Sequence, residues 1–250
     1  ISSDYSSKKT DLLIVSHFIS ENHQGLDQDF YFGNLALELR KHNISSQILL
    51  INHTGLKAKN VVAHWKNNAI PRIFFSNKLR LISELILFYK LVREARSLYK
   101  ASAFEVDETL ISVYKTAAKA AISFESVSAL RFSKQLELLV SKLKPKTILI
   151  TMEGHAFERL AFYAARQSDR NIKCFGYQHA ILFPHQHAIK RSLGHAYDPD
   201  IIFTAGNQTI STLDKGYKGT GVKVLNIGTH RFSCPKTIYD VRKIAPNSIC

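Results

Sequence analysis

The stretch KTILITMEGHAFERLAFYAARQSDRNIKCFGYQ, residues 146–178, decides the fold class. Its two short apolar runs, 146–152 and 172–178, are typical of buried parallel strands, and residues 156–168 between them are typical of a helix. Gly154 precedes this helix and would let the backbone turn sharply into it. The stretch therefore predicts a strand, a crossover helix and a second, parallel strand.

The same alternation continues on both sides of this unit. Helices are predicted at residues 30–41, with Asp27 or Asp29 as the capping residue, and at 208–213. Further apolar runs predict strands at residues 11–15, 46–52, 72–77, 200–206 and 222–228. Strands that alternate with helices indicate an α/β fold, with a parallel sheet and helices on both of its faces.

The middle of the chain is predicted to be a helical layer, with helices at residues 77–99, 107–123 and 127–143. The last of these should end before Pro145. The first helix and its neighbour Lys100 are basic, and a solvated face is the commonest meaning of such spacing; contact with lipid headgroups or nucleic acid are the alternatives. Its charged residues are Lys78, Arg80, Lys90, Arg93, Arg96 and Lys100 against Glu84 and Glu94.

Composition restricts the partners and the compartment. The formal net charge of +14 favours anionic partners, such as nucleotide donors, phosphorylated sugars or an acidic lipid surface. The three cysteines form no CxxC pair, and no stretch approaches the roughly 20 apolar residues that cross a bilayer. We therefore expect a cytoplasmic protein, with peripheral contact to the inner face of the membrane as an open option. Nucleic acid is a minor alternative, because no RNA-recognition, zinc-finger or helix-turn-helix motif is evident.

Polar residues follow two neighbouring strands of the predicted sheet. Glu153 and His155 follow the first strand and Gln178 and His179 the second, and ligands of parallel sheets bind beyond these carboxyl ends. Glu153 and Glu158 could act as an acid and base pair, although Glu158 could equally interact with the positive end of the helix dipole. His179 could hold a phosphate or exchange a proton, or simply bond to backbone as a loop histidine.

Other known ligand motifs are incomplete. His185 and His187 would share a side of an extended segment, but a third metal ligand at convincing spacing is lacking and no HExxH occurs. No GxGxxG or Walker A sequence follows a strand, and Gly219 to Gly221 precedes one, as in a plain turn. We therefore predict no metal and no dinucleotide or ATP cofactor.

Between residues 11 and 232, the order ILITMEGHAFERLAFYAAR, IKCFGYQHAILFP, PDIIFTAGNQTISTL and VKVLNIGTHRF resembles the N-terminal domain of GT-B glycosyltransferases. The likeness is greatest to bacterial transferases of O-antigen or capsule synthesis. YFGNLALEL, residues 31–39, resembles the first helix of such proteins. The resemblance implies a Rossmann-like domain at 1–232 that chiefly holds the acceptor. Residues 233–250 would be a linker or the start of a second, donor-binding domain outside this chain, so we expect a fragment that is inactive alone.

The resemblance also implies a reaction and a set of site residues. A sugar would move from a nucleotide-sugar donor, which is a substrate and not a cofactor, to a surface-glycan or lipid-linked acceptor. The expected catalytic residues are Glu153, His155 and Glu158, with Glu153 or His155 as the base or as the group that orients the acceptor. The expected substrate-binding residues are His17, Asp27, Tyr31, Gln178, His179, His185, Gly206 and Gly228.

Two other classes of function stay open. The first is a non-catalytic Rossmann-like module whose basic surface binds anionic glycan, lipid or RNA. The second is a metal-dependent hydrolase that uses His179, His185 and His187.

Overall fold

A computed structural model describes residues 9–20, 28–63, 65, 69–75 and 78–229. Seven parallel strands form one sheet in the order β3-β2-β1-β4-β5-β6-β7. The strands are β1 (Leu12–Phe18), β2 (Ser46–Asn52), β3 (Arg72–Phe74), β4 (Thr147–Thr151), β5 (Lys173–Gln178), β6 (Ile201–Thr204) and β7 (Lys223–Asn226). Each lies within two or three residues of a predicted strand, so the predicted parallel α/β sheet is confirmed.

The strand order identifies where a ligand would bind. The chain runs outward from β1 to β2 and β3, then crosses back to β4 and runs outward the other way. This is the order of a doubly wound, Rossmann-like sheet. β1 and β4 pair from Leu12 with Thr147 to Val15 with Ile150, so their carboxyl ends are neighbours at the point where the order reverses.

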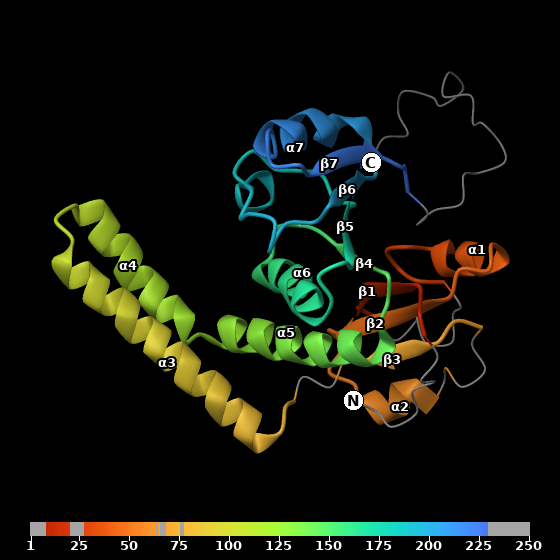
Figure 1. Cartoon of the computed structure of the whole chain (residues 1–250), viewed down its shortest axis with the longest axis horizontal. Helices are drawn as coiled ribbons and strands as arrows, with labels where there is room; N and C mark the ends of the chain where they lie inside the picture. The colour runs from red at the N-terminus through yellow and green to blue at the C-terminus, as the bar shows by residue number, and fades with distance from the viewer. Residues whose placement is uncertain (1–8, 21–27, 64, 66–68, 76–77, 230–250) are drawn as a thin grey trace, which may run out of the picture.

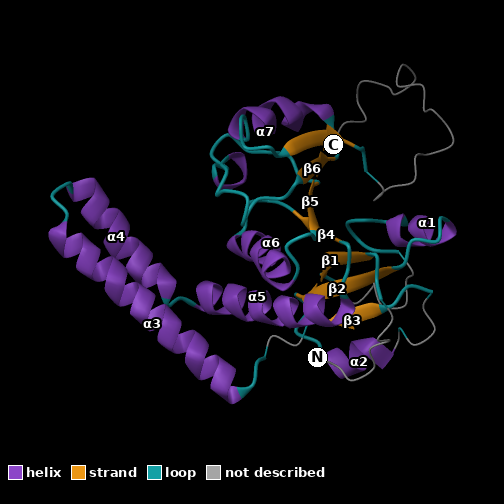
Figure 2. Cartoon of the chain, in the orientation of Figure 1, coloured by secondary structure: helices purple, strands orange, loops and turns teal. Residues whose placement is uncertain are grey.

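Helices cover both faces of the sheet, as predicted. Leu13 and Val15 of β1 join a core with α5 (Phe124–Leu143), α6 (Ala156–Ser168) and α7 (Ile210–Gly216). Leu12 and Ile14 point the other way, into a core with α1 (Leu35–Lys41) and α2 (Ala58–Ala63). This alternation follows the two-residue period of a strand. Figure 2 shows α6 and α1 on opposite sides of the strands.

Several helix ends differ from the prediction for local reasons. α5 ends at Leu143, before Pro145, as predicted, and α6 has the predicted bounds. α1 begins only at Leu35, because Gly33 has a φ of +52° and pairs with Asp29 in a short bridge. Asp29 therefore does not cap α1, and instead accepts hydrogen bonds from the N–H groups of Tyr31 and Phe32 in the preceding turn. Asp27, the other candidate cap, lies outside the described residues.

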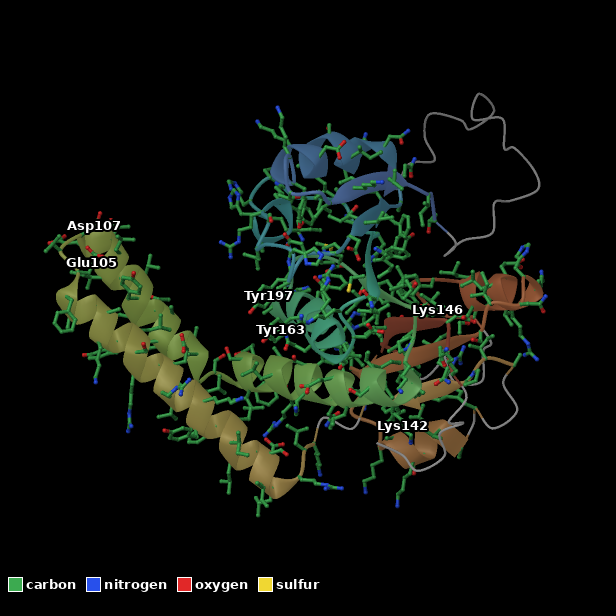
Figure 3. The ribbon with its side chains drawn as sticks, viewed as in Figure 1. Glu105, Asp107, Lys142, Lys146, Tyr163 and Tyr197 are labelled. Atoms are coloured by element: carbon green, nitrogen blue, oxygen red, sulfur yellow. The ribbon has the colours of Figure 1, made fainter. Side chains whose placement is uncertain are left out.

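The middle section is helical, but it is not a layer on the sheet. α3 (Leu81–Phe104) and α4 (Glu108–Ala121) pack against each other and project from the body as a hairpin (Figure 1). Only α5 of the three predicted helices packs along the sheet. Arg131 of α5 anchors the base of the hairpin, because its Nε lies 2.8 Å from a carboxylate oxygen of Glu84. At the far end, Glu105 and Asp107 bond to backbone N–H groups of the turn (Figure 3).

Shorter elements complete the fold. The described residues include two 3-10 helices, η2 (Ala188–Lys190) after β5 and η3 (Asn207–Thr209) immediately before α7. The helix predicted at 208–213 is thus a 3-10 turn followed by a helix that extends to Gly216. Sequence patterning did not predict α2. In the described part of the chain, no helix has the length and apolar character needed to cross a bilayer.

Candidate functional site

A group of polar side chains gathers beyond the carboxyl ends of β1, β4 and β5, at and beside the reversal of strand order. We call this group the carboxyl-edge cluster; its members are His17, Tyr31, His53, Thr151, Glu153, His155 and His179. Open α/β sheets bind their ligands at this edge. The structure thus brings together five of the predicted site residues: His17, Tyr31, Glu153, His155 and His179.

Glu153 lies between two imidazoles. Its Oε1 is 3.1 Å from Nε2 of His179, and its Oε2 is 3.4 Å from Nε2 of His155. One third of the Glu153 side chain is exposed, whereas only 11% of the His179 side chain is. A half-buried carboxylate held by two imidazoles can accept a proton from a bound hydroxyl group, and either imidazole can orient it.

Glu158 holds the backbone of the loop that carries Glu153. Its carboxylate accepts hydrogen bonds from the N–H groups of Glu153, Gly154 and His155, at 2.8 to 3.0 Å. Glu158 is 1% exposed, and burial raises its pKa to about 8, while the three N–H donors act in the opposite direction. These contacts lie at the start of α6, in agreement with the alternative role of Glu158 at the helix dipole. A catalytic role for Glu158 stays a prediction.

Gly154 brings this loop against the segment that follows β5. Its φ is +93°, which confirms the sharp turn that the sequence predicts. A Cβ atom at this position would lie 2.5 Å from the backbone nitrogen of Ile189 in η2. Both the backbone conformation and the close approach therefore require glycine.

His17 connects three strands of the cluster. Its Nε2 lies 2.9 Å from Oγ1 of Thr151, the last residue of β4, and its Nδ1 lies 2.9 Å from Nε2 of His53, just beyond β2. Burial and, to a smaller extent, the nearby imidazoles of His53, His179 and His155 together lower the pKa of His17 to about 4. His17 is therefore neutral at pH 7, so it supplies no positive charge, and its two ring nitrogens hold Thr151 and His53 in place.

Aromatic rings line the cluster. The Tyr31 ring meets the His179 ring edge-on, with centroids 4.5 Å apart, and meets His17 at 5.4 Å. The Phe157 ring stacks on His155, with 16° between the planes. Flat rings beside hydrogen-bonding groups suit a ligand with an apolar face and a polar edge, such as a sugar or a base.

A buried network anchors the long segment between β5 and β6. Arg159 of α6 is 3% exposed, and its guanidinium donates to Asp198 Oδ1 at 2.6 Å and to Tyr217 Oη at 2.7 Å. On the outside of α6, the rings of Tyr163 and Tyr197 stack with centroids 5.0 Å apart (Figure 3). The side chain of Gln186 in this segment also donates to the carbonyl of Glu153 at 3.3 Å. These contacts place the segment beside the cluster.

The contacts of the other predicted substrate-binding residues in the described chain are with groups outside the carboxyl-edge cluster, and Asp27 lies outside the described residues. Gln178 is buried, and its side-chain amide donates to the carbonyl of Ala180. The ring contact of His185 is with His187, with centroids 6.3 Å apart. Gly206 is extended, with open space where a side chain would lie, and the Gly228 carbonyl accepts from Tyr177 Oη at 3.3 Å. Their role in substrate binding stays a prediction.

The sequence prediction did not include two members of the carboxyl-edge cluster, His53 and Thr151, or the adjoining Phe157. His53, Thr151 and Phe157 contact His17 or His155. His53 and Thr151 each lie at the end of a predicted strand, which is the signal that could have identified them. Within the described ranges, no group of three or more His, Cys, Asp or Glu side chains could hold a metal ion.

Comparisons with known proteins give distant likenesses only. No protein-family model matches the sequence, and no curated protein is significantly similar to it. Among solved structures, the chain is similar to a UDP-N-acetylglucosamine 2-epimerase, with 11% identity, a TM-score of 0.45 and 86% of this chain covered. The chain spans 45% of the length of that epimerase.

Two further solved structures are less similar. A hydrogen sulfide-producing enzyme from Fusobacterium nucleatum has 12% identity and a TM-score of 0.23, over 90% of this chain and 79% of that one. A threonine deaminase from T.th. has 8% identity and a TM-score of 0.21, over 91% of this chain and 80% of that one. TM-scores below 0.5 do not establish a shared fold, so the assignment of the fold rests on the sheet topology.

Proposed function

We propose that this chain supplies the acceptor-binding, catalytic wall of a glycosyltransferase that uses a nucleotide-sugar donor. The acceptor would be a surface glycan or a lipid-linked sugar, as in O-antigen or capsule synthesis. The observation that carries the proposal is the Glu153 carboxylate, held 3.1 Å from His179 at the reversal of strand order. This is the position where an α/β sheet presents catalytic groups to a ligand.

In the proposed reaction Glu153 is the general base. It takes the proton of the acceptor hydroxyl while the hydroxyl oxygen forms a bond to the anomeric carbon of the donor sugar. The bond between that carbon and the diphosphate oxygen breaks, and the nucleoside diphosphate leaves with the electron pair. His179 and His155 hold the carboxylate in place on either side.

The structure also restricts what stabilises the leaving diphosphate. The N–H groups of Glu153, Gly154 and His155 already donate to Glu158, so they do not form a phosphate site. His17 is neutral at pH 7, because its pKa is about 4. Both ring nitrogens of His17 already have partners, in His53 and Thr151. We therefore assign His179 to hydrogen bonds with donor sugar or phosphate, and the main diphosphate contacts to a donor-binding domain.

The proposal is tested by an assay of nucleoside diphosphate release from UDP-, GDP- and dTDP-sugars, with a lipid extract as the acceptor source. The assay uses a protein that contains both this chain and the proposed donor-binding domain. Glu153→Gln and His179→Ala should each abolish release while circular dichroism stays unchanged. Glu137→Gln is the matched control, because this exposed carboxylate pairs only with nearby Lys134 in the described part of α5. Turnover that survives in both site variants, or no release from any donor, would contradict the proposal. Donor binding without release would instead favour a non-catalytic module.

A further inference from the structure

The α3–α4 hairpin carries a surface that the proposed reaction does not use. Six apolar side chains in the first turns of α3 are between 52% and 75% exposed. They are Leu81, Ile82, Leu85, Ile86, Phe88 and Tyr89. Burial of one such side chain is worth about 1.5–3 kcal/mol, so a contiguous exposed set indicates a surface that another phase or molecule covers.

These apolar residues share one side of α3 with three of its basic residues. At about 100° per residue, the six apolar side chains occupy an arc of roughly 160°. Three cations follow within the same arc: Arg93, Arg96 and Lys100. The two glutamates of α3 point elsewhere on the helix, and one of them, Glu84, is held by Arg131. All residues of α3 are described, so this side of the helix, which we call the outer face of α3, contains no acidic residue.

A groove between the two helices extends this charge. It has a volume of about 640 Å³ and is lined by residues between 92 and 122. Four cations surround it, two from each helix, over an apolar floor that includes Val92 and Ile122, and no Asp or Glu contributes to this described lining. The cations are Arg96, Lys100, Lys115 and Lys119. Apolar walls beneath a ring of cations match a ligand with an acyl chain and an anionic headgroup.

We propose that the hairpin docks on a membrane surface that contains acidic phospholipid. The outer face of α3 lies in the plane of the interface, its apolar turns enter the acyl boundary, and the groove cations bind lipid phosphates. Acidic lipid is favoured over nucleic acid because the apolar arc adjoins the cations, and lipid chains but not phosphodiester backbones cover such a surface.

Vesicle co-sedimentation of the protein tests this proposal. Phosphatidylcholine vesicles with phosphatidylglycerol should bind the protein, whereas phosphatidylcholine alone should bind it at least about tenfold more weakly, since each basic residue near an acidic surface contributes about 1 kcal/mol. Replacement of all four groove cations by alanine should weaken vesicle binding at least about tenfold; the substitutions are Arg96→Ala, Lys100→Ala, Lys115→Ala and Lys119→Ala. The double substitution Ile82→Ser and Phe88→Ser should also weaken vesicle binding. The remaining binding of this variant should still decrease as the salt concentration rises, because its cations are intact.

A matched variant controls for net charge. This variant removes four exposed charges from the body of the protein through Lys173→Ala, Lys215→Ala, Lys218→Ala and Lys223→Ala. It should bind vesicles within about twofold of the wild type. All substituted residues are exposed, so circular dichroism should not change. Equal loss in the two charge variants, or equal binding to both kinds of vesicle, would overturn the proposal. So would RNA binding or hairpin-dependent self-association in the absence of vesicle binding.

Discussion

Oε1 of Glu153 lies 3.1 Å from Nε2 of His179, although the two residues come from the ends of different strands. The pairing depends on β4 and β5 being parallel neighbours, with Thr151 level with Tyr177. It also depends on the loop after β4, which Glu158 and Gly154 hold in place. The site can therefore be tested through its supports as well as through its reactive groups.

Glu158→Ala should destabilise the fold by about 2 kcal/mol, because it leaves the N–H groups of Glu153, Gly154 and His155 without their acceptor. Urea unfolding measures the change. Glu125→Ala is the matched control, since Glu125 is an exposed glutamate in the first turn of α5 and its loss should cost less than about 0.5 kcal/mol. Equal effects of the two substitutions would show that Glu158 does not hold the loop.

Gly154→Ala should disrupt the contact between the loop after β4 and η2. The substitution adds backbone strain at a φ of +93° and places a methyl group against the backbone of Ile189. Gly194→Ala separates the two effects, because Gly194 has a φ of +90° and open space around it. The control should cost about 1–2 kcal/mol and Gly154→Ala clearly more in urea unfolding. Similar costs would show that the close approach to Ile189 is unimportant.

Acidification should destabilise the protein through His17. Its folded pKa of about 4 is below the ordinary value of 6.5, so the unfolded chain binds a proton more readily than the folded one. The contribution of His17 to stability is thus complete above about pH 6.5 and is lost as the pH falls through about 4. The free energy of unfolding should fall less between these pH values in His17→Gln than in the wild type. His42→Gln, at an exposed position after α1, should behave as the wild type.

Arg159 and Asp198 should be strongly coupled. Arg159→Met leaves the buried Asp198 carboxylate without its guanidinium partner, which should cost about 3–5 kcal/mol. Asp198→Asn alone should also destabilise the fold, and the double variant should lose less than the sum of the two. Thermal and urea unfolding of the wild type, the two single variants and the double variant give the double-mutant cycle. Additive losses would contradict a direct ion pair, and the exposed Lys134–Glu137 pair provides the weakly coupled comparison.

The strands and α6 could be predicted from the sequence because their signals are local. Apolar runs such as 147–151 and the helical period of 156–168 need no knowledge of distant residues. The start of α1 could not be predicted from helical periodicity, since the conformation of Gly33 and its bridge to Asp29 override that pattern.

The site was predictable in its location but not in its contacts. The carboxyl-end rule placed Glu153 and His179 at one edge, whereas the contacts of His17 with His53 and Thr151 require the register of three strands. The sequence also did not predict that α3 projects from the body of the protein. An apolar stripe on a helix ordinarily indicates a core-facing side, and here that stripe faces outward.

The central claim is that the carboxyl-edge cluster is where a nucleotide sugar meets this chain. The most direct test is a titration of isotope-labelled histidine side chains with UDP-, GDP- and dTDP-sugars, in a protein that contains this chain and the proposed donor-binding domain. The signals are assigned through single His→Gln variants. We predict that the signals of His17, His155 and His179 shift together with one dissociation constant for at least one donor, while that of His42 stays unchanged. Shifts confined to histidines outside the cluster, or none with any donor, would contradict the account.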